Sequence, residues 1–177
     1  MKLIKTKLND CFIIEPKVFR DTRGFFLETF QAERYTKSLK IDLPFVQDNH
    51  SRSSYGTLRG LHFQKNKPQG KLVRVSNGQV FDVVVDIRSN SSTFRMWEGF
   101  YLSGDNMKQL WVPPGFAHGF VVTSDIADFE YKCTEYYDPT DEECILWNDK
   151  DLSIKWPIND PQLSEKDLKG KNLGDLF

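Results

Sequence analysis

The segment QVFDVVVDI (79–87) decides the fold class, because its side chains alternate between two faces as they do along a β-strand. The segments 58–64, 94–102 and 128–135 read as strands in the same way, and turn signals at 76–78, 103–106 and 113–115 separate the runs. One face of the first segment is apolar and the other carries two aspartates: Phe81, Val83, Val85 and Ile87 against Asp82 and Asp86.

Many short strands at this spacing predict an all-β protein built as an antiparallel sandwich or barrel, and the pattern does not choose between the two. Short helices are expected near 30–39 and 163–170. A length of 177 residues without repeats, low-complexity segments or linkers predicts one domain over residues 1–177.

The composition excludes several classes of protein. A net charge of −1 with 28% charged residues is typical of a globular protein. Because the chain has no excess of basic residues, we expect no nucleic-acid partner. No apolar run approaches the roughly 20 residues of a membrane helix, and the N-terminus does not resemble a signal peptide. Three cysteines without C-x-x-C spacing favour free thiols in a reducing compartment, so we expect a soluble, cytoplasmic protein.

Two of the three histidines are candidates for chemistry. In LRGLHFQ (58–64), His62 shares a face with Gly60 and Gln64. In PPGFAHGF (113–120), His118 lies among glycines that indicate tight turns. A lone histidine on a strand is more often structural than catalytic, so the pattern alone leaves both roles open.

The charge distribution points to an anionic ligand. Residues 50–81 contain no Asp or Glu, although the whole chain is slightly acidic. A local cationic stretch around a histidine suits a phosphate group, while solvated loop lysines are the alternative. The cations are Arg52, Arg59, Lys65, Lys67, Lys71 and Arg74.

A metal site is the competing interpretation. The pattern PxGxxH from Pro113 to His118 matches the second metal motif of cupins, but the first motif needs His-x-His, and Gln64 stands at its second position. His62, His118 and one carboxylate could still form a smaller site. Tyr131 shares a strand face with Phe129 and Cys133, where a tyrosine is usually part of the core.

Together, these residues resemble the dTDP-4-dehydrorhamnose 3,5-epimerase family, from about residue 10 to residue 168. The resemblance rests on separated motifs, and no single one of them would be specific: FRDTRGFFLE (19–28), FVQDNHS (45–51), LRGLHFQ (58–64), QGKLVRV (69–75), GQVFDVVVDIR (78–88), QLWVPPGFAHGF (109–120), FEYK with the following YYDP, and LSEKD (163–167).

The resemblance implies a cupin-like jelly roll, usually a homodimer, that works without metal or cofactor on a nucleotide-linked 4-keto-6-deoxy sugar. Carbons 3 and 5 flank the ketone, so a base can remove a proton from one face while an acid returns one from the other. It implies His62 as base, Asp167 as its orienting partner, Tyr131 as acid and Lys71 near the carbon-4 oxygen. The implied substrate contacts are Arg23, Phe26, Glu28, Gln47, Asn49, Arg59, His118, Tyr137, Glu142 and Lys166.

Other functions stay open at this point. Related enzymes invert one carbon only or take other nucleotide sugars, such as a GDP-linked 4-keto heptose. Outside the class, the alternatives are a metal-dependent cupin isomerase or oxygenase and a non-catalytic sugar-nucleotide binding domain. Gln64 speaks against the former, and the presence of both His62 and Tyr131 speaks against the latter.

Overall fold

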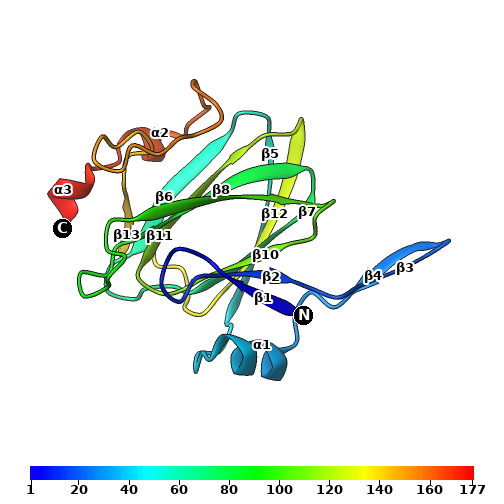
Figure 1. Cartoon of the computed structure of the whole chain (residues 1–177). Coiled ribbons are helices and arrows are strands. Elements are labelled where there is room, and N and C mark those ends of the chain that lie inside the picture. Colours follow the sequence, from blue (N-terminus) through cyan, green and yellow to red (C-terminus); the bar gives the residue numbers. More distant parts are fainter.

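The structure, a computed structural model that describes residues 1–177, consists mainly of two antiparallel β-sheets that face each other (Figure 1). The larger sheet has six strands in the order β1-β2-β10-β7-β12-β5. Its strands are β1 (Lys2–Lys5), β2 (Phe12–Glu15), β10 (Gln109–Val112), β7 (Lys71–Asn77), β12 (Ile126–Cys133) and β5 (Gln47–Ser54).

The smaller sheet has five strands in the order β13-β6-β11-β8-β9. The two sheets enclose the main core, to which both contribute apolar side chains such as Val73 and Phe129 from the first and Val80 and Val84 from the second. The all-β expectation is therefore confirmed, and the arrangement is a cupin-like jelly roll. The strands of the smaller sheet are β13 (Glu142–Cys144), β6 (Leu58–Gln64), β11 (Phe116–Val122), β8 (Gln79–Asp86) and β9 (Trp97–Ser103).

The smaller sheet is covered on its outer face as well. The C-terminal segment, orange to red in Figure 1, lies over β6 and β13 and supplies a second core cluster with Ile145, Leu152 and Leu173. The predicted apolar face of β8, including Val83 and Val85, packs there. The opposite face, which carries the two aspartates, points into the molecule, and both aspartates of β8 are fully buried.

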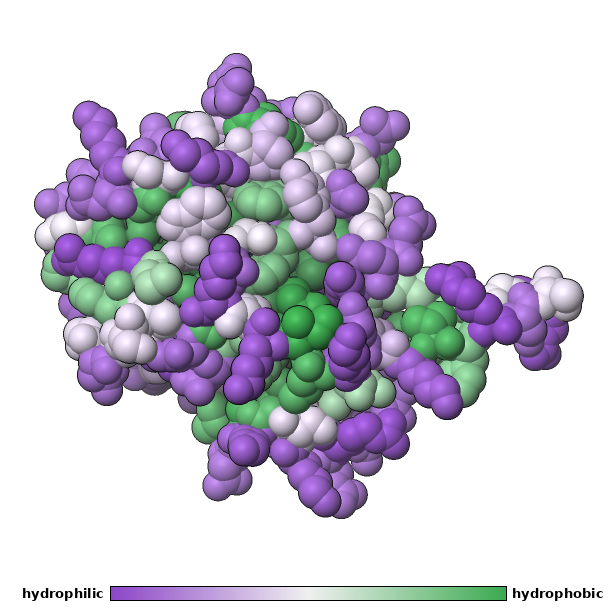
Figure 2. Space-filling model, in the orientation of Figure 1, coloured by the Kyte–Doolittle hydropathy of each residue, from purple (hydrophilic) through white to green (hydrophobic).

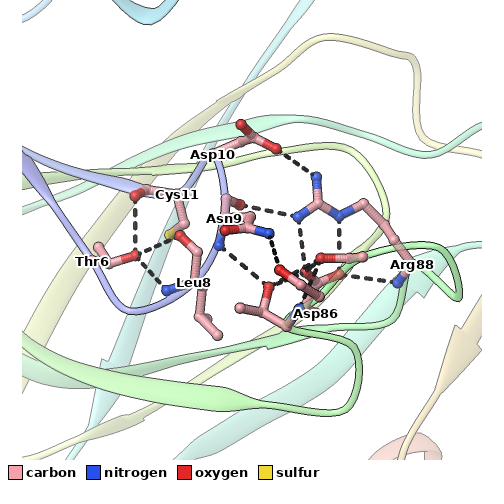
Figure 3. A network of polar contacts seen from close by, with 10 residues as sticks. Thr6, Leu8, Asn9, Asp10, Cys11, Asp86 and Arg88 are labelled. Atoms are coloured by element: carbon pink, nitrogen blue, oxygen red, sulfur yellow. Dashed lines mark hydrogen bonds and ion pairs between the residues drawn. The ribbon is translucent and has the colours of Figure 1, made fainter.

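The burial of Asp86 is balanced by a polar network that fastens the N-terminal loop to the barrel (Figure 3). Arg88 donates to both oxygens of Asp86, at 2.9 and 2.8 Å, and also to Asp10 at 2.9 Å. Ser91 and Thr93 donate to the same carboxylate. These hydrogen bonds outweigh the effect of burial and hold the pKa of Asp86 below its ordinary value.

Two predicted strands are shifted. The strand expected at 94–102 begins only at Trp97, because tight turns occupy the preceding residues. Arg95 adopts a left-handed backbone conformation, with φ of 65°, and its amide donates a hydrogen bond to the Asp86 carbonyl. The strand expected at 128–135 runs from Ile126 to Cys133, because Ile126 already pairs with Ser54 of β5.

A hairpin formed by β3 (Val18–Asp21) and β4 (Gly24–Leu27) stands out from the rounded body (Figures 1 and 2). Its rings are exposed to an unusual degree, with Phe25 at 57% and Phe26 at 69%. A hairpin alone is marginally stable, and exposed aromatic rings of this kind are typical of contact surfaces.

Three short helices complete the chain. α1 (Ala32–Leu39) begins where the Gln31 side chain accepts a hydrogen bond from the Arg34 amide, and it ends at Lys40 in the left-handed region. α2 (Glu165–Leu168) and α1 lie within the two predicted helical segments, whereas α3 (Leu173–Leu176) was not predicted. No helix in the structure combines the length and hydropathy needed to cross a membrane.

Candidate active site

A cavity of about 420 Å³ opens between the two sheets, and both sheets contribute polar side chains to it. Its volume falls in the range of about 300–1,000 Å³ typical of small-molecule sites. Eleven of the fourteen residues singled out in the sequence line this one cavity: Gln47, Asn49, Arg59, His62, Lys71, His118, Tyr131, Tyr137, Glu142, Lys166 and Asp167.

His62 faces the cavity because of the alternation along β6. Leu61 and Phe63 point to the opposite side and pack in the outer core cluster, as the sequence pattern predicts. The neighbouring strand β11 lies very close, since a Cβ on Gly60 would be 2.5 Å from the Cα of Gly119. This close approach sets His62 directly across from His118 in the strand register.

The His62 ring is oriented by a buried carboxylate. Its Nε2 lies 2.6 Å from Oδ1 of Asp167, whose other oxygen accepts a hydrogen bond of 2.7 Å from Ser164. Burial raises the pKa of Asp167, but these hydrogen bonds outweigh that effect and hold it below its ordinary value. An ionised Asp167 accepts a hydrogen bond from the protonated Nε2, which leaves the Nδ1 lone pair of His62 free to act as a base.

Tyr131 stands on the facing sheet, in β12. Its ring packs against Phe129 at 5.8 Å between centroids, and its hydroxyl has no hydrogen-bond partner within the chain. Burial, with the nearby Cys133, raises the pKa of Tyr131 above its ordinary value. The hydroxyl therefore keeps its proton at neutral pH and can donate it into the cavity.

Lys71, on β7, is the cation deepest in the site. It forms no ion pair with a carboxylate, and burial lowers its pKa, an effect that Cys133 and Asp82 oppose. Asp82 is fully buried, and its two oxygens lie 3.0 and 2.9 Å from Nε2 of His118. Burial raises the pKa of Asp82, while His118 and Lys71 lower it. Burial is the larger effect, so the pKa of Asp82 lies above its ordinary value.

The cationic stretch noted in the sequence is partly neutralised by strand pairing. The register of β12 sets Asp128 opposite Arg52 and Glu130 opposite Arg74, and both pairs form ion pairs. Arg59 escapes this pairing, since its only side-chain hydrogen bond within the chain is from Nε to the Ser53 hydroxyl. Arg59 and Lys71 are therefore the two members of the stretch that line the cavity without a carboxylate partner.

A cluster of polar side chains surrounds the His62 edge of the cavity. Glu142 accepts hydrogen bonds from the Tyr137 hydroxyl, at 2.7 Å, and from the Lys166 ammonium. The other Glu142 oxygen lies 3.8 Å from Nδ1 of His62. A carboxylate at this distance stabilises the imidazolium that forms when His62 accepts a proton.

The comparison with protein families gives a match over residues 5–175 to the model described as dTDP-4-dehydrorhamnose 3,5-epimerase. The chain belongs to the dTDP-4-dehydrorhamnose 3,5-epimerase family. A relative of that name from Escherichia coli K12 is 54% identical, over all of this chain and 97% of its own length.

Solved structures of the epimerase family share the fold. The dTDP-6-deoxy-D-glucose-3,5-epimerase of Legionella pneumophila, in complex with dTDP-4-keto-L-rhamnose, is 54% identical, with a TM-score of 0.95 over 98% of this chain and 93% of that chain. A more distant match is a 3'-monoepimerase of Streptomyces bikiniensis in complex with dTDP-quinovose. It is 30% identical, with a TM-score of 0.90 over 96% of this chain and 86% of that chain.

Three residues implied by the resemblance to the epimerases lie outside the cavity of this chain. Arg23 and Phe26 are on the projecting hairpin, and Glu28 follows it. Arg23 pairs with Asp21 at 2.6 Å, and Glu28 pairs with Arg34. The chain does not bring these residues to His62.

Gln64 does not point a free ligand atom into the cavity. Its Nε2 donates to the carbonyls of Lys67 and Tyr136, at 2.8 and 3.2 Å, and its Oε1 accepts from the Asp138 amide at 2.8 Å. This side chain fastens the loops beside the cavity. Where metal-binding cupins carry a ligand, this epimerase family member therefore carries a structural glutamine.

Sequence reasoning missed three members of the site. Cys133 lines the cavity, and Asp82 lies behind it against His118. Both carried signals in the sequence, namely a face shared with Tyr131 and a carboxylate within an apolar strand. Ser164 caps α2, accepting from the Asp167 amide, and Ser-x-x-Asp is a known helix-start pattern. That pattern would have linked Ser164 to the carboxylate that orients His62.

Proposed function

We propose that this chain inverts carbons 3 and 5 of dTDP-4-dehydro-6-deoxyglucose to give dTDP-4-dehydrorhamnose, a step in the biosynthesis of surface-polysaccharide sugars. The observation that carries the proposal is the pairing of an oriented histidine on one sheet with an unpaired tyrosine hydroxyl on the other, across one cavity. An inversion needs a base and an acid on opposite faces of the same carbon.

His62 is the proposed base. Asp167 holds its Nε2 proton, so Nδ1 takes the proton from the carbon next to the ketone. The resulting imidazolium lies between the Asp167 and Glu142 carboxylates, which offset its charge. A histidine is suited to this step, because its ordinary pKa lies near neutral pH.

Tyr131 is the proposed acid, and Lys71 the proposed stabiliser of the enolate. Proton removal moves negative charge onto the carbon-4 oxygen, and an ammonium group fixed beside that oxygen lowers the energy of the intermediate. Tyr131 then delivers its proton from the wall opposite His62. The same pair serves both carbons when the sugar ring presents each in turn.

The diphosphate and the nucleotide are held by the remaining polar residues. Arg59, which lacks a carboxylate partner, suits the diphosphate, and Gln47, Asn49, His118, Tyr137 and Lys166 complete the substrate contacts. We propose that the active protein is a homodimer in which the hairpin of a second copy brings Arg23, Phe26 and Glu28 to the nucleotide. The exposed rings of the hairpin support this assignment.

We further propose that residues 1–177 act as one domain in the cytoplasm, without a cofactor. The three buried cysteines, all free, support a reducing compartment.

The test is incubation with dTDP-4-dehydro-6-deoxyglucose in heavy water, with the sugar analysed by NMR. We expect deuterium at carbons 3 and 5 and the rhamno product, and neither with the matched His62→Ala variant. Deuterium at one carbon would favour a single-carbon epimerase. Exchange only with another nucleotide sugar, such as a GDP-linked 4-keto heptose, would change the substrate. Binding without exchange would favour a non-catalytic domain.

A further inference from the structure

Cys144 is a neighbour of the proposed base His62 and takes no part in the proposed catalytic steps. It is in β13, and the register of β13 with β6 sets it directly opposite His62. The adjacent residues Leu61 and Ile145 exchange both backbone hydrogen bonds, at 3.2 and 2.9 Å. Cys144 and His62 therefore form the next, non-hydrogen-bonded pair, in which side chains on the same face come closest.

Asp167 completes a group of three ligand types around one point. The ligand atoms of His62, Cys144 and Asp167 all lie within 4.8 Å of one another. Bonds of about 2.0–2.3 Å in tetrahedral geometry would put such atoms about 3.3–3.7 Å apart. The 2.6 Å contact between His62 and Asp167 has to lengthen when a cation replaces the proton that now lies between them, and any separation near the 4.8 Å limit has to shorten by about 1 Å.

We propose that His62, Cys144 and Asp167 form an inhibitory site for a thiophilic divalent cation such as Zn²⁺. One nitrogen, one sulfur and one carboxylate oxygen are a zinc-type ligand set, and a water molecule completes the tetrahedron. The inhibitory effect rests on the proposed function of His62 as base, whereas the binding of the cation does not.

The surroundings favour the bound cation in two ways. The carboxylate of Glu142, 3.8 Å from Nδ1 of His62, can accept the proton of that nitrogen once Nε2 is a ligand. Such carboxylate–histidine contacts support metal-binding rings in many sites. A surface hollow of about 490 Å³ is lined in part by Cys144, so this ligand can be approached from solvent.

Cation binding would remove the base without unfolding the site. The Cys144 thiol releases its proton to solvent, and the His62 proton moves from Nε2 to Nδ1 through solvent. Nδ1 then has no lone pair with which to accept a proton from the sugar. Burial raises the pKa of the Cys144 thiol to about 12, so only a cation that binds thiolate strongly can displace its proton. Zn²⁺ is such a cation, whereas Mg²⁺, which prefers oxygen ligands, should not bind.

The first test uses Co²⁺ as a spectroscopic probe of the protein without substrate. We expect a near-ultraviolet thiolate-to-cobalt charge-transfer band, which disappears in Cys144→Ser and remains in Cys133→Ser, the matched control with a thiol in the cavity. If Cys144→Ser does not fold, Cys144→Ala replaces it. Absence of the band, or its persistence in the Cys144 variant, would overturn the site.

The second test measures epimerisation during titration with Zn²⁺ and, as a control, Mg²⁺. Outer-shell partners of metal ligands are worth roughly 10- to 100-fold in affinity. We therefore expect Cys144→Ser to raise the zinc concentration for half-inhibition at least about tenfold, with its metal-free activity unchanged. Equal zinc sensitivity of both proteins would overturn the inhibitory role. If the wild type epimerises no sugar, the proposed function fails, and the cobalt test still decides the site.

Discussion

Replacing Tyr131 by Phe tests the acid assignment most directly, because it removes one hydroxyl and keeps the ring against Phe129. The structure predicts separate effects on the two halves of the reaction. Proton removal by His62 can continue, so solvent deuterium still enters the sugar. Delivery from the opposite wall is lost, so net inversion should fall by roughly 10²- to 10⁴-fold, the usual contribution of a general acid or base. This equals about 2.7–5.5 kcal/mol of barrier.

Stability provides the second readout. The Tyr131 hydroxyl has no hydrogen-bond partner within the chain, so its removal leaves no group unsatisfied and should change the free energy of unfolding by less than about 0.5 kcal/mol. Tyr35 is the matched control, since its buried hydroxyl donates to Gln109 at 2.9 Å. Tyr35→Phe should cost about 1–3 kcal/mol, with Tm falling about 2–4 °C per kcal/mol, and should retain inversion.

The assay follows deuterium incorporation and product stereochemistry by NMR in one sample, with Tm measured by calorimetry. Near-wild-type inversion by Tyr131→Phe at unchanged Tm would refute the acid assignment. A loss of inversion in Tyr35→Phe as large as that in Tyr131→Phe would show that the assay reports packing and not proton delivery.

His62→Ala should abolish exchange at both carbons with Tm little changed, and retention of more than a few per cent of exchange would remove His62 from the role. Lys71→Met should lower kcat by roughly 10²- to 10³-fold, the range for loss of one oxyanion stabiliser. Lys65→Met, outside the cavity, should leave kcat unchanged. Equal losses of kcat in the two variants would contradict the role of Lys71 in stabilising the enolate. Chelation by EDTA should leave epimerisation unchanged, and a loss restored by one specific divalent ion would favour a metal-dependent cupin. The depressed pKa of Asp86 contributes stability that is present above its unfolded value of about 3.9 and is lost as pH falls through the lower folded value. In urea titrations, the free energy of unfolding of the wild type should therefore fall below about pH 4 more steeply than that of Asp86→Asn. Parallel curves of this free energy against pH would contradict the contribution of Asp86.

The sequence was sufficient for features that depend on neighbouring residues. Strand β6 was predicted with its observed bounds, and the inward direction of His62 followed from simple alternation with Leu61 and Phe63. The strand that begins at Trp97 was predicted too early, because the turns before it are fixed by hydrogen bonds to β8 and not by local preference.

Features that depend on distant segments needed the resemblance or the structure. Asp167 lies 105 residues from His62, and no local pattern joins the two. The neutralisation of Arg52 by Asp128 depends on the register of β5 with β12, which the sequence alone does not reveal. For the same reason the projecting position of Arg23, away from the cavity of its own chain, appeared only in the structure.

The contact between Gly60 and Gly119 bears on how this site can change during evolution. A side chain at either position would collide with the backbone of the other strand, since a Cβ on Gly119 would lie 2.7 Å from the Arg59 carbonyl oxygen and 3.0 Å from the Gly60 Cα. Neither glycine can be replaced first and compensated later at the other, because both additions push the same two backbones apart. The spacing of the strands that carry His62 and His118 therefore depends on both glycines at once, whereas a half-exposed lining residue such as Tyr137 can change without moving either backbone.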